Sequence, residues 1–258
     1  GNGNFTWVEL GTGSQTNRGI DVATDNSGNV YVIGQFSDTI TFDVQHPNTG
    51  FNAIFVIKYN TSGQEQWFRR ISGGASNFGT AIEASGNGTV YLTGDFTGTL
   101  TFFGSTNNTL TNPYTNKVFV ASYATGGNFS WAEAAGSDGL LNSRAIAIDG
   151  SGNVAIGGEF TCKLNEFADV YGQGTFNAVG ERDIYIARYN ASGAFQYARN
   201  LGGRQEDFAF GVALTNNGRV HYTGSYTDDL FVPTSSAFLT SNTGLWTQLD
   251  CSTNAGYC

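Results

Sequence analysis

Short runs of alternating apolar and polar residues, separated by tight clusters of Gly, Asn and Ser, make up most of the chain. The first part of the chain contains four such runs, at residues 20–24, 30–33, 54–59 and 64–71. The clusters at 25–29 and 61–63 suit hairpin turns, because Gly and Asn tolerate positive φ. No segment keeps the 3.6-residue period of an amphipathic helix over several turns. The pattern therefore predicts antiparallel strands and few helices.

The same pattern occurs four times. Its first marker is an aromatic residue at intervals of 60, 64 and 66 residues: Trp7, Trp67, Trp131 and Tyr197. In every copy a glycine follows this marker after 27 residues: Gly34, Gly94, Gly158 and Gly224. Three further positions stay in register: Phe36, Phe96, Phe160 and Tyr226; Ile40, Leu100, Leu164 and Leu230; and Phe55, Phe119 and Tyr185. We therefore predict one domain over residues 1–258, built of four units at about 7–66, 67–130, 131–196 and 197–258.

A unit of this length that holds four antiparallel strands has the size of a propeller blade. We predict an all-β fold, a β-propeller of four four-stranded blades. Residues 5–10 match the fourth strand of a unit, and the last unit ends without one. Pairing between them would close the ring and remove exposed strand edges. Two alternatives stay open: the strand is donated to a neighbouring molecule, which gives self-association by strand addition, or the chain is part of a larger propeller.

Two segments of the first unit, 28–36 and 53–63, resemble the bacterial β-propeller repeat known as the SBBP repeat. Their echoes lie at 88–96, 117–127, 152–160 and 183–193. The fourth unit departs from this pattern after Phe231, where residues 245–249 replace the aromatic run only loosely. The resemblance implies a propeller that is extracellular or attached to the cell surface, and it implies no shared set of catalytic residues.

Composition narrows the classes of partner. Only 13% of the residues are charged, against roughly 25% in an average domain, and the net charge is -9. This balance argues against binding nucleic acid or an anionic membrane by charge. No run approaches 18 apolar residues, so membrane insertion is not expected. The chain has no Met, no basic leader and no apolar segment of the signal-peptide kind, so we expect a mature chain whose targeting segment has been removed.

All variation in unit length lies in the connection between the second and third strands, at about 43–54, 103–118 and 167–184. Variable loops on a rigid scaffold commonly carry binding residues, so we expect a protein or glycan ligand on this face. The candidates are the aromatic residues Phe51, Tyr114, Tyr171 and Phe176, and the polar residues Arg204, Glu206 and Asp207 in the connection into the last unit. Three alternatives stay open: unconstrained loops, aromatic residues that only cover the blades, and a solvated charge cluster.

Metal, cofactor and catalytic motifs are missing from the sequence. The turns 25–29 and 149–153 place oxygens at alternating positions but lack the distal Glu of a calcium loop, so we predict hydrogen-bonded turns. His46 and His221 have no histidine or Cys-x-x-Cys partner nearby in sequence, so we expect no zinc site and no cofactor. Asp228 and Asp229 are adjacent carboxylates, but a glycosidase needs a defined separation across a cleft. We therefore predict no catalytic residues.

The three cysteines are an odd set. Cys251 and Cys258 lie seven residues apart across a turn-rich segment, and we predict a disulfide between them. Cys162 would then keep a free thiol. Asn-x-Ser/Thr sequons, candidate N-glycosylation sites, begin at Asn4, Asn60, Asn87, Asn107, Asn128 and Asn190.

The sequence thus favours a secreted or cell-surface propeller that is a non-catalytic module for adhesion, recognition or structural self-assembly. A carbohydrate-binding lectin is the alternative function. A glycan hydrolase or lyase is less favoured.

Overall fold

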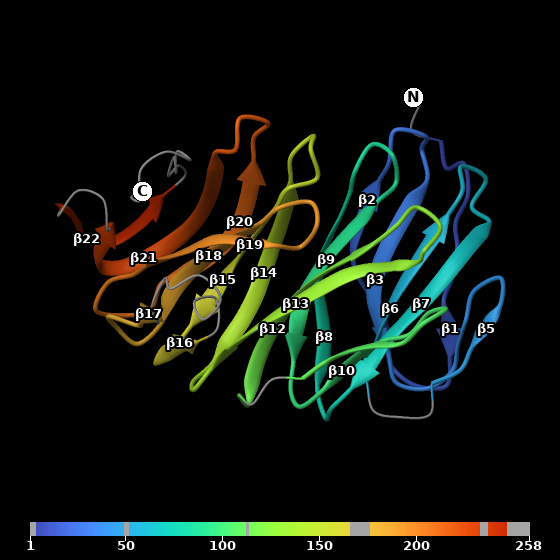
Figure 1. Cartoon of the computed structure of the whole chain (residues 1–258), viewed down its shortest axis with the longest axis horizontal. Helices are drawn as coiled ribbons and strands as arrows, with labels where there is room; N and C mark the ends of the chain where they lie inside the picture. Colours follow the sequence, from blue (N-terminus) through green and yellow to red (C-terminus); the bar gives the residue numbers. More distant parts are fainter. Residues whose placement is uncertain (1–3, 49–51, 112–113, 166–175, 233–236, 247–258) are drawn as a thin grey trace.

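The described part of this computed structural model comprises residues 4–48, 52–111, 114–165, 176–232 and 237–246. Every regular element in these ranges is a β-strand, and the strands form sheets that stand side by side (Figure 1). The predicted all-β class is therefore confirmed, and the four-stranded antiparallel sheets are consistent with propeller blades.

Each blade is a series of consecutive antiparallel strands. The first blade consists of β2 (Asn17–Thr24), β3 (Val30–Phe36), β6 (Ala53–Tyr59) and β7 (Glu65–Gly73). The second consists of β8 (Asn77–Ala84), β9 (Val90–Phe96), β12 (Asn116–Tyr123) and β13 (Phe129–Ser137). The third consists of β14 (Leu141–Ile148), β15 (Val154–Phe160), β18 (Asp183–Tyr189) and β19 (Phe195–Leu201). In the described residues the last blade has three strands, β20 (Phe208–Leu214), β21 (Val220–Val232) and β22 (Ala237–Trp246).

The hydrophobic core lies between neighbouring blades. The third strand of each blade turns a pair of β-branched residues toward the next blade: Ile54 and Val56, Val118 and Val120, and Ile184 and Ile186. The first pair belongs to one cluster with Leu92 and Phe119 of the second blade, and all four residues are completely buried. Full burial of such a side chain stabilises the fold by about 1.5–3 kcal/mol. Each blade is therefore stable only against its neighbour.

Part of the variable connection is ordered as a short hairpin, which in the second and third blades crosses to the preceding blade. These hairpins consist of β4 (Ile40–Thr41) with β5 (Gln45–His46), β10 (Leu100–Phe102) with β11 (Asn108–Leu110), and β16 (Lys163–Asn165) with β17 (Phe176–Asn177). Leu100 pairs with Gly73 on β7, and Leu164 pairs with Ser137 on β13, so these two hairpins extend the outer edge of the preceding sheet. The first hairpin instead pairs through β4 with β1 (Thr12–Gly13), which follows the N-terminal segment. The hairpins also explain why an apolar residue recurs at the position of Ile40 and Leu100, because both side chains are buried. A strand edge that is covered in this way has no row of unpaired N–H and C=O groups with which another chain could pair.

A tryptophan fastens the outer strand of one blade to a hairpin turn of the next. The indole N–H of Trp67 donates to the carbonyl of Thr125 at 3.0 Å, and that of Trp131 donates to Ala191 at 3.1 Å. A Cβ atom on Gly127 would lie 2.8 Å from the Trp67 ring, and one on Gly193 would lie 2.5 Å from the Trp131 ring. The turn therefore has to present a glycine to the indole.

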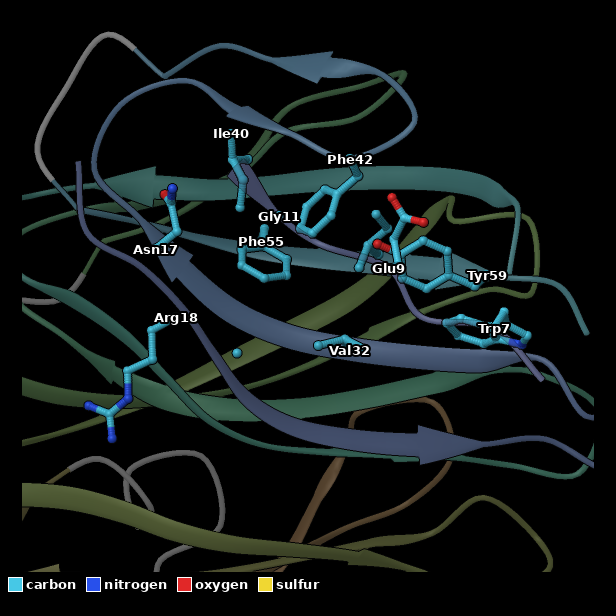
Figure 2. A pocket seen from close by; sticks show the side chains of 12 residues that line it. Trp7, Glu9, Gly11, Asn17, Arg18, Val32, Ile40, Phe42, Phe55 and Tyr59 are labelled. Carbon is cyan, nitrogen blue, oxygen red and sulfur yellow. The ribbon is translucent and has the colours of Figure 1, made fainter. Parts of the chain in front are cut away.

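The structure does not show the predicted ring closure. The first and last blades lie at opposite ends of the long axis, and residues 5–10 form no strand (Figure 1). Trp7 instead packs 5.6 Å from Tyr59 of the first blade and against Gly63, as Trp67 does against Gly127. The outward face of the first blade is covered by this segment and by β4, with a pocket of about 260 Å³ beneath them (Figure 2). The N-terminal segment thus takes the position that an outer strand takes at the other blade interfaces.

The tryptophan contact leads to a stability prediction. Gly193→Ala adds a Cβ at φ 85° and against the Trp131 ring. Left-handed strain of roughly 1–2 kcal/mol then adds to an overpacking cost of roughly 1–3 kcal/mol. Gly28→Ala is the matched control, since Gly28 has φ 78° and only a methyl group of Thr61 nearby. Chemical denaturation should show a larger loss for Gly193→Ala, and equal losses would contradict a specific role for the indole contact.

Candidate functional site

A pocket of about 330 Å³ opens where the innermost strands of three blades, β2, β8 and β14, lie side by side. We call it the inner-strand pocket. The residues that matter for its chemistry are Arg18, Ile20, Gln35, Phe78, Thr80, Asp95, Ser143 and Arg144. They lie near the starts of the innermost strands and the ends of β3 and β9. The pocket is therefore at the end of the blades from which the second-to-third connections leave, the face predicted to bind a ligand.

Two repeat positions supply four of the polar pocket residues, Gln35, Thr80, Asp95 and Arg144. The first is a β-bulge in the innermost strand, where one residue has no partner on the adjacent strand: Ile20, Thr80, Arg144 and Phe210. Bulges redirect a side chain out of the regular pleat. The second position follows the repeat glycine: Gln35, Asp95, Glu159 and Ser225. The side chain of Gln35 donates to the carbonyl of Asn77 at 3.0 Å, and the backbone N–H of Ser143 donates to Asp95 at 2.6 Å. These side chains bridge one blade to the next.

Three hydroxyl groups fix the wall of the pocket between the second and third blades. The hydroxyl of Ser143 lies 2.7 Å from that of Thr93 and 3.0 Å from that of Thr80. Thr93 donates to the carbonyl of Phe119 at 2.7 Å, and Thr80 to that of Thr93 at 3.2 Å. A connected network of this kind holds its members in one geometry. The backbone N–H of Ser143 is therefore held in place against Asp95.

The arginines and carboxylates of the pocket are unequal in exposure. The Nε of Arg144 donates to both carboxylate oxygens of Glu159, at 2.9 and 3.1 Å. The Glu159 side chain is 1% exposed, whereas 45% of the Arg144 side chain is exposed. Arg18 is exposed, and its side chain makes no hydrogen bond or ion pair within the described chain. It points away from the aromatic group beneath the N-terminal segment (Figure 2). The pocket therefore presents positive groups to solvent.

Asp95 is the pocket residue with the strongest titration shift. Removal from solvent, with a smaller contribution from the Glu159 charge, raises its pKa to about 7. The N–H of Ser143 and the charge of Arg144 oppose this rise. Because a carboxyl with a pKa near neutrality exists in both protonation states, Asp95 can act as a hydrogen-bond donor or acceptor at physiological pH.

A second concave site lies at the outer edge of the first blade, and we call it the outer-edge groove. Its volume is about 450 Å³, and its walls include Pro47, Phe68, Arg70 and Phe103. His46 stacks on Phe68 with ring centroids 3.7 Å apart and pairs with Glu65 at 3.0 Å. The Arg70 guanidinium lies 4.1 Å from the ring centroid of Phe103. The groove thus combines aromatic faces with a cation.

The structure does not gather the predicted ligand residues into one site. Tyr114 is half-buried in the second blade, while the connection that carries Arg204 enters the last blade, with the third blade between them. Glu206 pairs with Arg182 at 3.2 Å. Asp207 is completely buried and accepts the N–H groups of Gly203 and Thr227, so its carboxylate is not available at the surface. Phe51, Tyr171 and the side chain of Phe176 lie outside the described residues.

Sequence reasoning missed the residues of the inner-strand pocket. The bulge and post-glycine positions were in register in all four units, yet their chemistry changes from unit to unit. That variation at two fixed positions was the available indication. It could be interpreted only once the two positions were known to lie on adjacent strands at the blade interface.

The turns 25–29 and 149–153 are hydrogen-bonded turns in the structure. Asp25 accepts the backbone N–H groups of Ser27 and Asn29 at 2.9 and 3.0 Å, and Asp149 does the same for Ser151 and Asn153. In the described ranges no three His, Cys, Asp or Glu residues form a group that could hold a metal ion. There, too, no helix has the length and apolar character needed to cross a membrane.

The modification candidates are only partly visible. Cys251 and Cys258 lie outside the described residues, so the predicted disulfide stays a prediction. Cys162, the single cysteine within the described ranges, is exposed and has a φ of 61°. Of the sequon asparagines, Asn4, Asn87, Asn107 and Asn128 are exposed. Asn60 and Asn190 are half-buried, and each accepts two backbone N–H groups of its own turn.

Comparison with known proteins gives one related sequence. No family model matches the chain, so the resemblance to the SBBP repeat stays an expectation. Over 176 residues, 66% of the chain, the sequence is 30% identical to an uncharacterized WD repeat-containing protein, L264, of Acanthamoeba polyphaga mimivirus. The chain is related to WD-repeat-like β-propellers. It covers 13% of the length of that viral protein.

A solved structure from Bacteroides caccae, of a protein of unknown function, aligns with 93% of this propeller at a TM-score of 0.41 and 11% identity. The propeller covers 63% of the Bacteroides chain.

Three buried carboxyl groups make the stability of the fold depend on pH. Burial raises the pKa of Asp95 to about 7 and those of Asp183 and Asp207 to about 6. Because these folded-state values exceed the ordinary pKa of Asp, their contribution is greatest below about pH 4 and is lost as pH rises through 6–7. We expect a lower melting temperature at pH 8 than at pH 5, measured by circular dichroism.

Asp207→Asn should reduce this pH dependence. Asparagine is already accommodated at this repeat position, since Asn17 and Asn77 stand at the equivalent strand starts of the first two blades. A melting temperature that rises from pH 5 to pH 8 in the wild type would show that these carboxyl groups do not govern the effect.

Cys162 offers a test of local backbone strain. The equivalent residue of the second blade is Gly98, which has φ 71°. Cys162→Gly should raise stability by roughly 0.5–1 kcal/mol, because relief of left-handed strain exceeds the added freedom of the unfolded chain. Cys162→Ser changes the thiol but not the backbone preference and should be neutral. Denaturant unfolding under reducing conditions measures both, and destabilisation by Cys162→Gly would refute the strain assignment.

Proposed function

We propose that this propeller is a non-catalytic module for recognition or adhesion, which binds a protein or glycan ligand at the end of the blades that carries the second-to-third connections. The observation that supports this most strongly is the inner-strand pocket. There, groups from three blades converge on one concave site, and two of them are exposed arginines. Convergent polar groups in a preformed pocket are typical of ligand sites.

The rigidity of the pocket also favours binding. Ser143 is held by two hydroxyl groups, and the guanidinium of Arg144 is held by Glu159. Side chains that are fixed before the ligand arrives lose little conformational entropy on binding. A site built on strands rather than on loops is the more precise kind.

A secreted or cell-surface location is part of the proposal. The resemblance of residues 28–36 and 53–63 to the SBBP repeat supports it, as do the exposed sequons. Self-association by strand addition also remains a proposal. It is supported by the unpaired state of residues 5–10 and by β22, whose only strand neighbour in the described chain is β21.

A lectin function is the second candidate, because the outer-edge groove has the aromatic faces on which sugar rings stack. Phe103→Ala would separate the two candidates. It should weaken a ligand of the groove and leave a ligand of the inner-strand pocket unaffected.

A binding screen tests the leading proposal. The intact chain would be presented to an array of glycans and extracellular matrix proteins, and Arg18→Glu would be tested on each ligand found. We expect at least about tenfold weaker binding, because a reversed charge in the pocket faces the ligand. Asn26→Ala on the opposite, hairpin-turn face is the control and should bind normally. Equal binding by wild type and both variants would place the ligand site elsewhere.

A further inference from the structure

We infer that the inner-strand pocket binds a small organic carboxylate, such as a sugar acid, which Arg18 and Arg144 hold from two sides. This inference rests on the proposed recognition function and names the ligand class for the same pocket.

The charge expected of the ligand follows from which charged groups of the pocket are exposed. The carboxylate of Glu159 is completely buried and occupied by Arg144, so it does not face a ligand. Arg18 and Arg144 are the exposed charged groups, in a chain whose net charge is -9. A cationic ligand would meet two arginines. An anion meets an exposed positive patch that contrasts with the rest of the molecule.

The geometry of Arg144 favours a carboxylate over a spherical anion. Both oxygens of Glu159 contact its Nε, and its Nη1 and Nη2 atoms make no hydrogen bond with the described residues. The outer edge of the guanidinium therefore keeps its donors for a ligand. Two parallel N–H donors match the two oxygens of a carboxylate. Glu159 positions the guanidinium for this contact.

The remainder of the pocket suits a small organic body with hydroxyl groups. Phe78 is 42% exposed and, with Ile20, gives the pocket an apolar side. The side-chain amide nitrogen of Gln35 is used by Asn77, so its oxygen is left as an acceptor. A pocket of about 330 Å³ is at the lower end of the range for small-molecule sites. A monosaccharide acid satisfies the charge, the acceptor and the apolar side together.

Asp95 adds a dependence on pH. One of its oxygens accepts the N–H of Ser143, and the other makes no hydrogen bond in the described chain. The charged groups around it are Arg18 of the first blade and Arg144 and Glu159 of the third, and the phenol of Tyr185 also interacts with its charge. A protonated Asp95 can donate to a ligand oxygen, whereas the ionised form repels a carboxylate. Binding should therefore strengthen as pH falls below about 7.

The probes are D-glucuronate and D-glucose, which differ mainly in a carboxylate. Each would be titrated into the isotope-labelled intact chain while the backbone amide signals of Gly79, Thr80 and Ser143 are followed by NMR. We expect D-glucuronate to shift these signals saturably with an affinity in the millimolar range or tighter, and D-glucose to leave them unchanged. Arg18→Gln should weaken D-glucuronate roughly tenfold or more, because it removes a hydrogen bond between charged groups.

Two variants keep the test independent of folding. Arg18 has no partner in the described chain, so Arg18→Gln should keep the wild-type melting temperature. Asp95→Asn keeps an acceptor for Ser143 and provides a permanent donor, so its affinity for D-glucuronate should no longer change between pH 6 and pH 8. A wild type whose affinity is unchanged over that range would overturn the role of Asp95.

Three other results of the titrations would also decide whether the pocket binds a carboxylate. Equal binding of D-glucose at the same amides would overturn the carboxylate preference and leave the recognition proposal in place. Binding of inorganic phosphate without D-glucuronate would overturn it in favour of another anion. No shift with any probe up to roughly 10 mM, weaker than even millimolar binding, would overturn the inference. The array screen would still test the proposed function by itself.

Discussion

The packing of each blade against its neighbour is the contact on which the rest of the structure depends. All seven residues of β6, β15 and β18 are buried, so these strands have apolar surface on both faces of their sheets. A four-stranded sheet of this kind cannot fold alone in water. Each blade therefore supplies the core of the next, and stability is distributed along the chain as in other repeat proteins. The indole contacts of Trp67 and Trp131 and the crossing hairpins fix the blades in one relative position.

The same constraint produces the inner-strand pocket. Because the third-strand residues are committed to the blade interface, the innermost strands are the place where side chains can differ without loss of core. Thr80 and Arg144 differ in this way on the innermost strands, while Asp95 and Gln35, near the ends of β9 and β3, bridge the blades through backbone groups of Ser143 and Asn77. The pocket lies between these bridges. Its geometry is therefore as fixed as the blade interface itself.

The sequence predicted where the strands lie much better than it predicted which strands pair with one another. The repeat located the strands of the first three blades through period and turn chemistry, and it correctly placed Trp67 and Trp131 on outer strands. In the last unit it indicated residues 245–249, whereas β22 spans Ala237–Trp246. The crossing hairpins could not be predicted, since Leu100 pairs with Gly73 on the outer strand of the preceding blade and alternation does not specify a pairing strand. Asp207 was interpreted as part of a surface charge cluster because its sequence neighbours Arg204 and Glu206 are charged. Its burial accompanies tertiary contacts that the sequence does not reveal, including the hydrogen bond from the N–H of Thr227 on β21.

The inner-strand pocket could not be predicted for a related reason, because its residues come together only through the pairing and packing of strands. Its chemistry follows from how the units differ. Within one blade, the charges of the bulge residue and of the post-glycine residue generally balance. The third blade pairs Arg144 with Glu159, whereas the first combines the uncharged Ile20 with Gln35. The second blade breaks this rule, because Thr80 offers Asp95 no positive charge.

The cation that opposes the rise in the pKa of Asp95 is Arg144 of the next blade, which is already bound to Glu159. A carboxyl that shares its cation with a better-placed carboxylate is poorly compensated, and this accounts for the rise of its pKa to about 7. The lack of a cation at Thr80 of the same blade thus leaves the pocket with a carboxyl group, Asp95, that can change its charge near neutral pH.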